Sequence, residues 1–177
     1  MLLKERLAEP KGHWKLEVYE GDIEREQRTL PNGLVLPGRV LNKKLDQLEG
    51  RNLVTTVGKG LLLDRLFALG TPPTQVNSMG VGTVSTAASA GDTQMNQGGG
   101  GSSFLQAFDA LPTRAGTVVT AISTFATGSA NFAWAELGMF NGTTNGTSLL
   151  LNRIAPIGPF TKSSAVSIIV TVQLTQS

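Results

Sequence analysis

The sequence predicts a mainly β protein, an antiparallel β-sandwich or jelly roll with one short helix and an N-terminal arm. Apolar and polar residues alternate with a period of two over residues 14–19 and again over 165–174, which is typical of half-buried strands. Gly, Pro and Asn recur at short intervals and divide the chain into short strands. Only residues 58–69 carry leucines at helical spacing.

The N-terminal third is expected to contain an arm followed by short strands. Residues 1–12 are charged and contain Pro and Gly near their end, which favours an arm or a short helix. The alternating segment 14–19 predicts a strand. The Pro-Asn-Gly sequence at 31–33 is a turn signal, because Asn and Gly tolerate positive φ. A short strand at 34–36 then ends at a Pro-Gly pair, and the mixed-charge residues 39–51 form a connection.

The predicted helix spans residues 58–69. Leu62, Leu66 and Leu69 follow one another at i, i+4 and i+7. Gly70 is placed to end the helix, and the two prolines that follow prevent its continuation.

The remainder of the chain is expected to be strands joined by turns. The predicted strands are 76–84 with breaks at Gly80 and Gly82, 118–125, 131–140, a strand beginning at Leu149 and interrupted at 156–159, and the final strand 165–174. Two Asn-Gly pairs after residue 140 mark a turn, which also explains their match to the glycosylation sequon. The Ser/Ala/Gly-rich segment 85–103 is expected to be mobile or held by a neighbour.

One face of the final strand is expected to line the core, with an aromatic side chain of the 131–140 strand packed against it. The residues of that face are Val166, Ile168, Val170, Val172 and Leu174, and the aromatic candidates are Phe132 and Trp134. Aromatic residues in such a position belong to a core more often than to a ligand-stacking platform.

Charged residues are concentrated at one end of the chain. The first 66 residues carry 12 of the 15 Lys and Arg and 10 of the 13 Asp and Glu. We divide the chain into residues 1–50, a charged N-terminal arm with edge strands, and residues 51–177, the β-sandwich domain. The charge-poor part lacks the solvated charge that keeps a monomer soluble. It therefore predicts a component of an assembly and a homo-oligomer formed through residues 67–177.

Composition narrows the classes of partner. The chain has no Cys, which excludes disulfides and thiolate chemistry. Its net charge is +2, and basic and acidic residues are interleaved, so no nucleic-acid surface is expected. No apolar run approaches the roughly 18 residues of a membrane span, and no secretory signal is evident, so no membrane partner is expected.

The sequence yields no catalytic residue, no cofactor-binding residue and no metal ligand, and we expect neither an enzyme nor a cofactor. His13 is the only histidine and is expected at the surface, since one His without Cys builds no transition-metal site. The Val-Gly-Lys-Gly sequence at 57–60 lacks the first Gly and the Ser/Thr of a phosphate loop and fits a strand-to-helix turn.

Three carboxylates lie in the charge-poor part of the chain, at Asp92, Asp109 and Glu136. A glycosidase needs two carboxylates held about 5 to 10 Å apart. Asp92 falls in the expected mobile loop, and Glu136 is expected to pair with Arg153 or with a backbone donor, so the sequence favours a structural role for them.

The order of several short motifs resembles a group of small virion proteins of tailed bacteriophages. Asn52-Leu53-Val54 followed by Gly58-Lys59 precedes the Leu-rich helix, and Met79-Gly80-Val81-Gly82 follows it. Glu136-Leu137-Gly138-Met139-Phe140, Leu149 to Arg153, and Phe160-Thr161-Lys162 come next, before the final strand. The resemblance covers residues 52–175 and extends to attachment domains of phage tail-fibre proteins. The exact glycine-turn and strand motifs of the group, "IGTG" and "EAGLF", are replaced here.

The resemblance implies a non-enzymatic structural protein of the virion, assembled in the host cytoplasm and bound to the major capsid protein or to tail proteins. The short chain favours a capsid decoration (cement) protein, and a tail or tail-fibre attachment protein is the alternative. A carbohydrate-binding module would require an exposed Trp134, and a glycan-cleaving module a carboxylate pair. Residues 1–50 are expected to order by lying across neighbouring subunits; the alternative is that residues 14–57 add strands to their own sheet and only residues 1–12 are free. Residues 1–12 are expected to anchor the protein to its neighbours.

Overall fold

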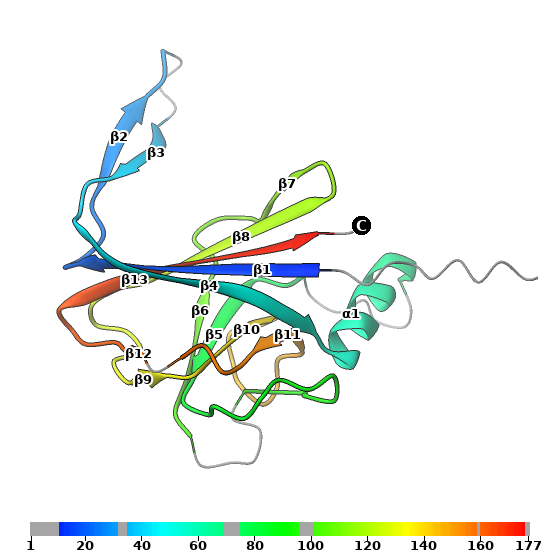
Figure 1. The fold of residues 1–177 in the computed structure, drawn as a ribbon. Helices are drawn as coiled ribbons and strands as arrows, with labels where there is room; N and C mark the ends of the chain where they lie inside the picture. The colour runs from blue at the N-terminus through cyan, green and yellow to red at the C-terminus, as the bar shows by residue number, and fades with distance from the viewer. Residues whose placement is uncertain (1–10, 32–34, 69–74, 96–100, 159, 176–177) are drawn as a thin grey trace, which may run out of the picture.

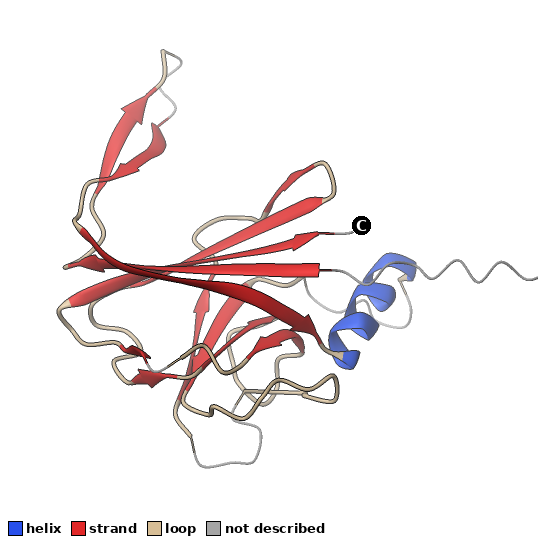
Figure 2. Cartoon of the chain, viewed as in Figure 1, coloured by secondary structure: helices blue, strands red, loops and turns tan. Residues whose placement is uncertain are grey.

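Antiparallel strands are the main secondary structure of the computed structural model, which describes residues 11–31, 35–68, 75–95, 101–158 and 160–175. Nine of the described strands form one large curled sheet, and four more form two small two-stranded sheets. One helix lies at one end of the molecule (Figures 1 and 2). The prediction of a mainly β, sandwich-like fold with one short helix is therefore confirmed.

The strands of the large sheet run in the order β6-β5-β10-β11-β4-β1-β13-β8-β7. The elements are β1 (Lys11–Glu20), β2 (Arg25–Thr29), β3 (Val35–Val40), β4 (Lys44–Val54), α1 (Thr56–Phe67), β5 (Ser78–Gly82), β6 (Ser103–Ala107), β7 (Thr113–Ala115), β8 (Val118–Phe125), β9 (Ala133–Trp134), β10 (Glu136–Phe140), β11 (Leu150–Ile154), β12 (Phe160–Thr161) and β13 (Val166–Thr175). The small sheets are β2-β3 and β12-β9. All paired strands are antiparallel.

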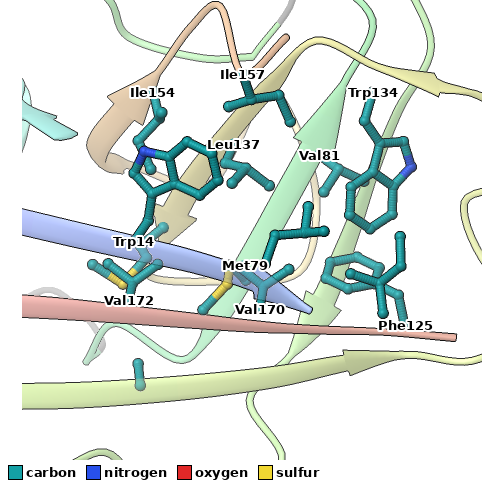
Figure 3. Close-up of a cluster of buried hydrophobic side chains, with 14 of the residues drawn as sticks. Trp14, Met79, Val81, Phe125, Trp134, Leu137, Ile154, Ile157, Val170 and Val172 are labelled. Atoms are coloured by element: carbon teal, nitrogen blue, oxygen red, sulfur yellow. The ribbon is translucent and has the colours of Figure 1, made fainter. Parts of the chain in front are cut away.

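The core lies between the two halves of the curled sheet, as Figure 3 shows for side chains of β1, β13 and β8 that meet those of β5, β10 and β11. The predicted face of the final strand is part of it: Ile168, Val170 and Val172 are buried. Trp134 is fully buried and packs edge-on against Phe125, with ring centroids 4.9 Å apart. Ile169 is buried on the opposite face, so β13 is covered on both sides near its start.

β1 differs from the expected edge position, because it pairs along its whole length with β13 and over most of it with β4. β1 and β4, from the N-terminal third of the chain, therefore belong to the same sheet as the C-terminal strands. Residues 11 and 12 of the expected arm belong to β1, which begins at Lys11. Residues 1–10 lie outside the described residues. The expected connection 39–51 is wrong: most of it is β4, an 11-residue strand whose charged side chains remain exposed.

The boundary between β4 and α1 is defined by Thr55. Its hydroxyl accepts a hydrogen bond from the Gly58 N–H at 3.0 Å and donates one to the Leu150 carbonyl at 2.8 Å. Thr55 is fully buried, so the same side chain caps the helix and attaches it to β11. The helix begins and ends two residues earlier than predicted and terminates at Ala68, which has a left-handed conformation. The predicted stop at Gly70 lies outside the described residues.

Several glycines expected to interrupt elements lie inside them. Gly80 and Gly82 are within β5, where the Phe140 ring occupies the space that a Gly80 side chain would need. Gly58, from the sequence compared with a phosphate loop, lies in the first turn of α1 and lets the helix backbone approach the Leu151 carbonyl of β11. β3 also runs through Pro37, which is tolerated because β3 pairs on one side only.

The Ser/Ala/Gly-rich segment is largely ordered where the structure describes it. Residues 83–95 are held by hydrogen bonds from the Thr56 N–H to the Ala90 carbonyl and from the Ala88 N–H to the Ala155 carbonyl. Met95 is fully buried in a small cluster with Phe140 and Leu150. The end of the segment forms the start of β6, which the sequence analysis missed. The glycines at 98–100 lie outside the described residues.

Candidate interaction surface and buried charge cluster

The most unusual surface of the described chain is the exposed apolar side of α1. The helix contacts the body at its start, where Gly58 and Leu61 are buried against β11. Four large apolar side chains further along the helix remain exposed: Leu62 at 43%, Leu63 at 52%, Leu66 at 74% and Phe67 at 64%. Figure 1 shows the helix at the end of β4, beyond the ends of the strands. The leucine pattern that predicted the helix is therefore not a core-facing stripe.

An apolar pocket of about 240 Å³ lies next to this helix. Leu62 of α1 contributes to its lining. The other lining residues are all apolar and come from strands of both halves of the sheet and from the segments that flank β5 and β7: Val76, Phe108, Pro112, Val119, Ala121, Met139, Leu151, Val172 and Leu174. We call α1 residues Leu62, Leu63, Leu66 and Phe67, together with this pocket, the apolar end of the molecule. An apolar surface with this extent is typical of an interaction site.

A second projecting feature is the β2–β3 hairpin, which extends away from the large sheet in Figure 1. Its strands pair only with each other. The base is attached by Asn42, whose carboxamide accepts from the Glu24 N–H at 2.6 Å and donates to the carbonyls of Glu20 and Asp22. A two-stranded hairpin is marginally stable alone in water. Contact with another molecule would stabilise it.

The charge-poor part of the chain contains a buried cluster centred on Arg153. Its Nε donates to Glu136 Oε2 at 2.7 Å, and its Nη1 donates to Asp92 Oδ2 at 2.8 Å. Arg153 and Glu136 are fully buried, and Asp92 is 8% exposed. Burial disfavours the charge of Arg153, but the hydrogen bonds and charges of the two carboxylates outweigh it and raise the pKa of the guanidinium. The predicted pairing of Glu136 with Arg153 is confirmed.

Asp92 was expected in a mobile loop, and its place in this cluster is a correction. The structure thus brings together two of the three carboxylates that the sequence offered for hydrolysis. Asp92 Oδ2 and Glu136 Oε2 are both bound to the Arg153 guanidinium. Arg153 thereby fastens the 83–95 segment to β10 and β11. Asp109 lies apart and accepts hydrogen bonds from the backbone N–H and the hydroxyl of Thr124.

A second buried cation, Lys162, lies near the β9–β12 pair. Its ammonium donates to Asn131 Oδ1 at 2.8 Å, and to the Thr127 and Ser163 carbonyls at 3.4 Å. Burial lowers the pKa of Lys162, while the charge of Asp22 partly opposes this effect. Hydrogen bonds from the Thr127 hydroxyl and N–H lower the pKa of Asp22 below its ordinary value of 3.8. These contacts join the start of the β2–β3 hairpin to the loops after β8 and β12.

The remaining site candidates occupy ordinary structural positions. His13 is exposed on β1, and the described residues contain no group of three or more His, Cys, Asp or Glu suited to a metal ion. Trp134 donates its indole N–H to the Ala130 carbonyl at 2.8 Å and is fully buried, so the exposed platform needed for carbohydrate stacking is not formed there. No helix in the described part of the chain has the length and hydrophobicity to span a membrane.

Comparison with known proteins found no matching family model, no similar curated protein and no similar solved structure. The function of the chain must therefore be argued from its own residues.

Proposed function

We propose that the chain is a non-enzymatic structural protein of a tailed-phage virion, and within that class a capsid decoration protein that docks on neighbouring subunits. The observation that carries this proposal is the apolar end of the molecule. Exposure of Leu62, Leu63, Leu66 and Phe67 to water is unfavourable in free energy. Burial against a partner removes it.

The other surfaces support the same class of function. The β2–β3 hairpin pairs only with itself, and contact with a neighbouring subunit would stabilise it. Arg153 uses the two buried carboxylates to fasten a loop to the sheet, which is a structural use of charged groups. The motif order over residues 52–175, which resembles that of small virion proteins, is the reason for proposing a phage particle as the assembly.

The experiment is a co-sedimentation assay with particles that lack the protein. The full chain is added back as wild type, as a Leu66→Gln/Phe67→Gln variant, and as a control variant Leu149→Gln, which alters an exposed apolar residue directly before β11. We expect wild type and the control to attach and the helix variant to lose at least 90% of its attachment. Unchanged melting temperatures of the three free proteins would show that the loss is one of docking.

Particle images decide between the two locations. Density for the chain on the capsid surface supports the decoration protein, and density at the tail supports the alternative, a tail or tail-fibre attachment protein. Full attachment by the helix variant would refute the docking role of α1. Absence of the chain from purified particles would refute a virion function altogether.

A further inference from the structure

The helix α1 has apolar residues on two of its sides. Gly58 and Leu61 are buried on the side that faces the sheet. Successive residues of an α-helix are about 100° apart around its axis. The four exposed apolar residues therefore lie within an arc of about 140° on a different side, in the order Leu62, Leu66, Leu63 and Phe67. An amphipathic helix packs against a core with an apolar stripe of about 100° or more. The exposed stripe is wide enough to be a second packing face.

The apolar pocket is a hollow directly beside this stripe. Leu62 lines the pocket, and Leu66, which is 74% exposed, lies one turn further along the same side of the helix. In Figure 1 the helix, the C-terminal end of β13 and the turn between β7 and β8 all lie at one end of the molecule. The apolar end of the molecule therefore combines a protruding side chain and a hollow in one surface.

The size and lining of the pocket select an apolar side chain as its occupant. An apolar cavity of about 150 Å³ accepts a benzene molecule, so the pocket of about 240 Å³ has room for one Leu or Phe side chain. All ten side chains that line it are apolar. A ligand with polar groups would lose hydrogen bonds to water there and gain none from these side chains.

The exposed apolar area is large enough for one side of a stable dimer. Beyond the pocket the apolar surface continues to Leu111, which is 75% exposed and lines a neighbouring pocket that shares Val76, Phe108 and Pro112 with the first. With roughly 200 Å² for each large apolar side chain, the exposed parts of Leu111 and of the four helix residues amount to about 600 Å². Stable complexes bury roughly 600–1,000 Å² on each partner.

We propose that the apolar end is the interface of a symmetric homodimer, in which Leu66 of each copy enters the pocket of the other. The proposal rests on the proposed function, which makes the apolar end a docking surface, and it names a second copy of this chain as the partner. A two-fold axis between the protrusion and the hollow fills both hollows at once, because the same surface supplies the two complementary parts. Interfaces between identical subunits are also the most apolar and have few charges in their core.

The first test measures self-association of the full chain by analytical ultracentrifugation, without particles. Wild type is expected to sediment as a dimer at micromolar concentration. Leu66→Gln places a polar group in the partner's pocket, and we expect it to raise the dissociation constant at least tenfold. Val119→Phe narrows the pocket from its exposed rim and is expected to have the same effect. Leu45→Gln is the matched control, at a residue that is 47% exposed at the start of β4, away from α1, and should stay within twofold.

Cysteine cross-linking locates the contact, since the chain has no Cys of its own. Copies with Leu66→Cys are mixed with copies that carry Val119→Cys and are oxidised. A disulfide requires Cα atoms within about 7 Å of each other. We therefore expect this mixture to form a linked dimer at least tenfold faster than a mixture of the Leu66→Cys and Leu45→Cys variants.

Several results would overturn the proposal: a wild type that stays monomeric, a dimer that Leu66→Gln and Val119→Phe leave unchanged, or equal linking in the two mixtures. A monomer whose α1 amides exchange slowly until residues 1–10 are removed would overturn it in favour of the chain's own N-terminal segment. A monomer that attaches to particles through α1 would overturn it and leave the proposed function standing. A dimer that forms through Leu66 and attaches to no particle would support it and refute the virion function.

Discussion

Replacement of Arg153 by Met is the substitution with the largest predicted effect on the buried charge cluster. Met fills similar volume but leaves Glu136, which is fully buried, and Asp92 without the shared cation that they contact at 2.7 and 2.8 Å. Removing one partner of a buried ion pair costs about 3–5 kcal/mol, because the remaining charge stays desolvated. Total stabilities are about 5–15 kcal/mol, so this loss is a large fraction of the whole.

The loss is measured by urea and thermal unfolding of the full chain at neutral pH. For a protein of this size each kcal/mol lowers the melting temperature by about 2–4 °C, so we expect a decrease of roughly 6–20 °C. Arg114→Met, at an exposed residue that donates to the Gly116 carbonyl, is the matched control and should change stability by about 0.5 kcal/mol or less.

A triple variant separates the charge effect from packing. Replacing Glu136 by Met and Asp92 by Leu in the Arg153→Met background removes the uncompensated carboxylates, and we expect most of the lost stability to return. The reasoning is refuted if Arg153→Met alone costs less than about 1 kcal/mol with an unchanged denaturant slope, or if the triple variant is no more stable than the single one.

Three further predictions concern other elements. Thr55→Ala should lower stability by about 1–3 kcal/mol, because it removes the helix cap and leaves the buried Leu150 carbonyl without its hydroxyl donor. Thr55→Ser keeps the hydroxyl and should retain most of the wild-type stability, and chemical unfolding of both variants measures the difference. Val170→Asp should cost roughly 3 kcal/mol or more, since it places a charge in the core, and a melting temperature equal to wild type would contradict the assignment of β13. Asp22→Asn should reduce the loss of stability in acid, because the folded-state pKa of Asp22 is lowered. The stability that the ionised Asp22 contributes is present above pH 3.8 and disappears as the pH falls through the folded-state pKa. Plots of unfolding free energy against pH that run parallel for the two proteins from pH 7 to pH 2 would contradict this.

Local pattern determined the β fold and much of its core. The alternation at 165–174 predicts β13 correctly, because side chains of a strand point to alternate faces and one of these faces lines the core. The paired roles of Glu136 and Arg153 were also predictable. Opposite charges are few in the C-terminal part of the chain, and a buried charge in an apolar sheet needs a partner.

The tertiary structure decided features that depend on contacts distant in sequence. Residues 44–51 have the composition of an exposed loop, and they form a strand because β1 offers them a pairing edge. Asp92 lies in a segment of low complexity and is fixed by Arg153, 61 residues away. Nothing local encodes such a pairing.

The exposed side of α1 shows the same limit in the candidate interaction surface. The leucine spacing of 62 and 66 predicts a helix but not which side packs, and only the contact of Gly58 and Leu61 with β11 leaves those leucines outside. Trp14 and Asn52 each reach over the neighbouring strand because a glycine lies opposite each of them in the β1–β4 register. The sequence by itself therefore determined which segments form strands and a helix, whereas the strand register, a long-range property, determined which surfaces remain available for binding.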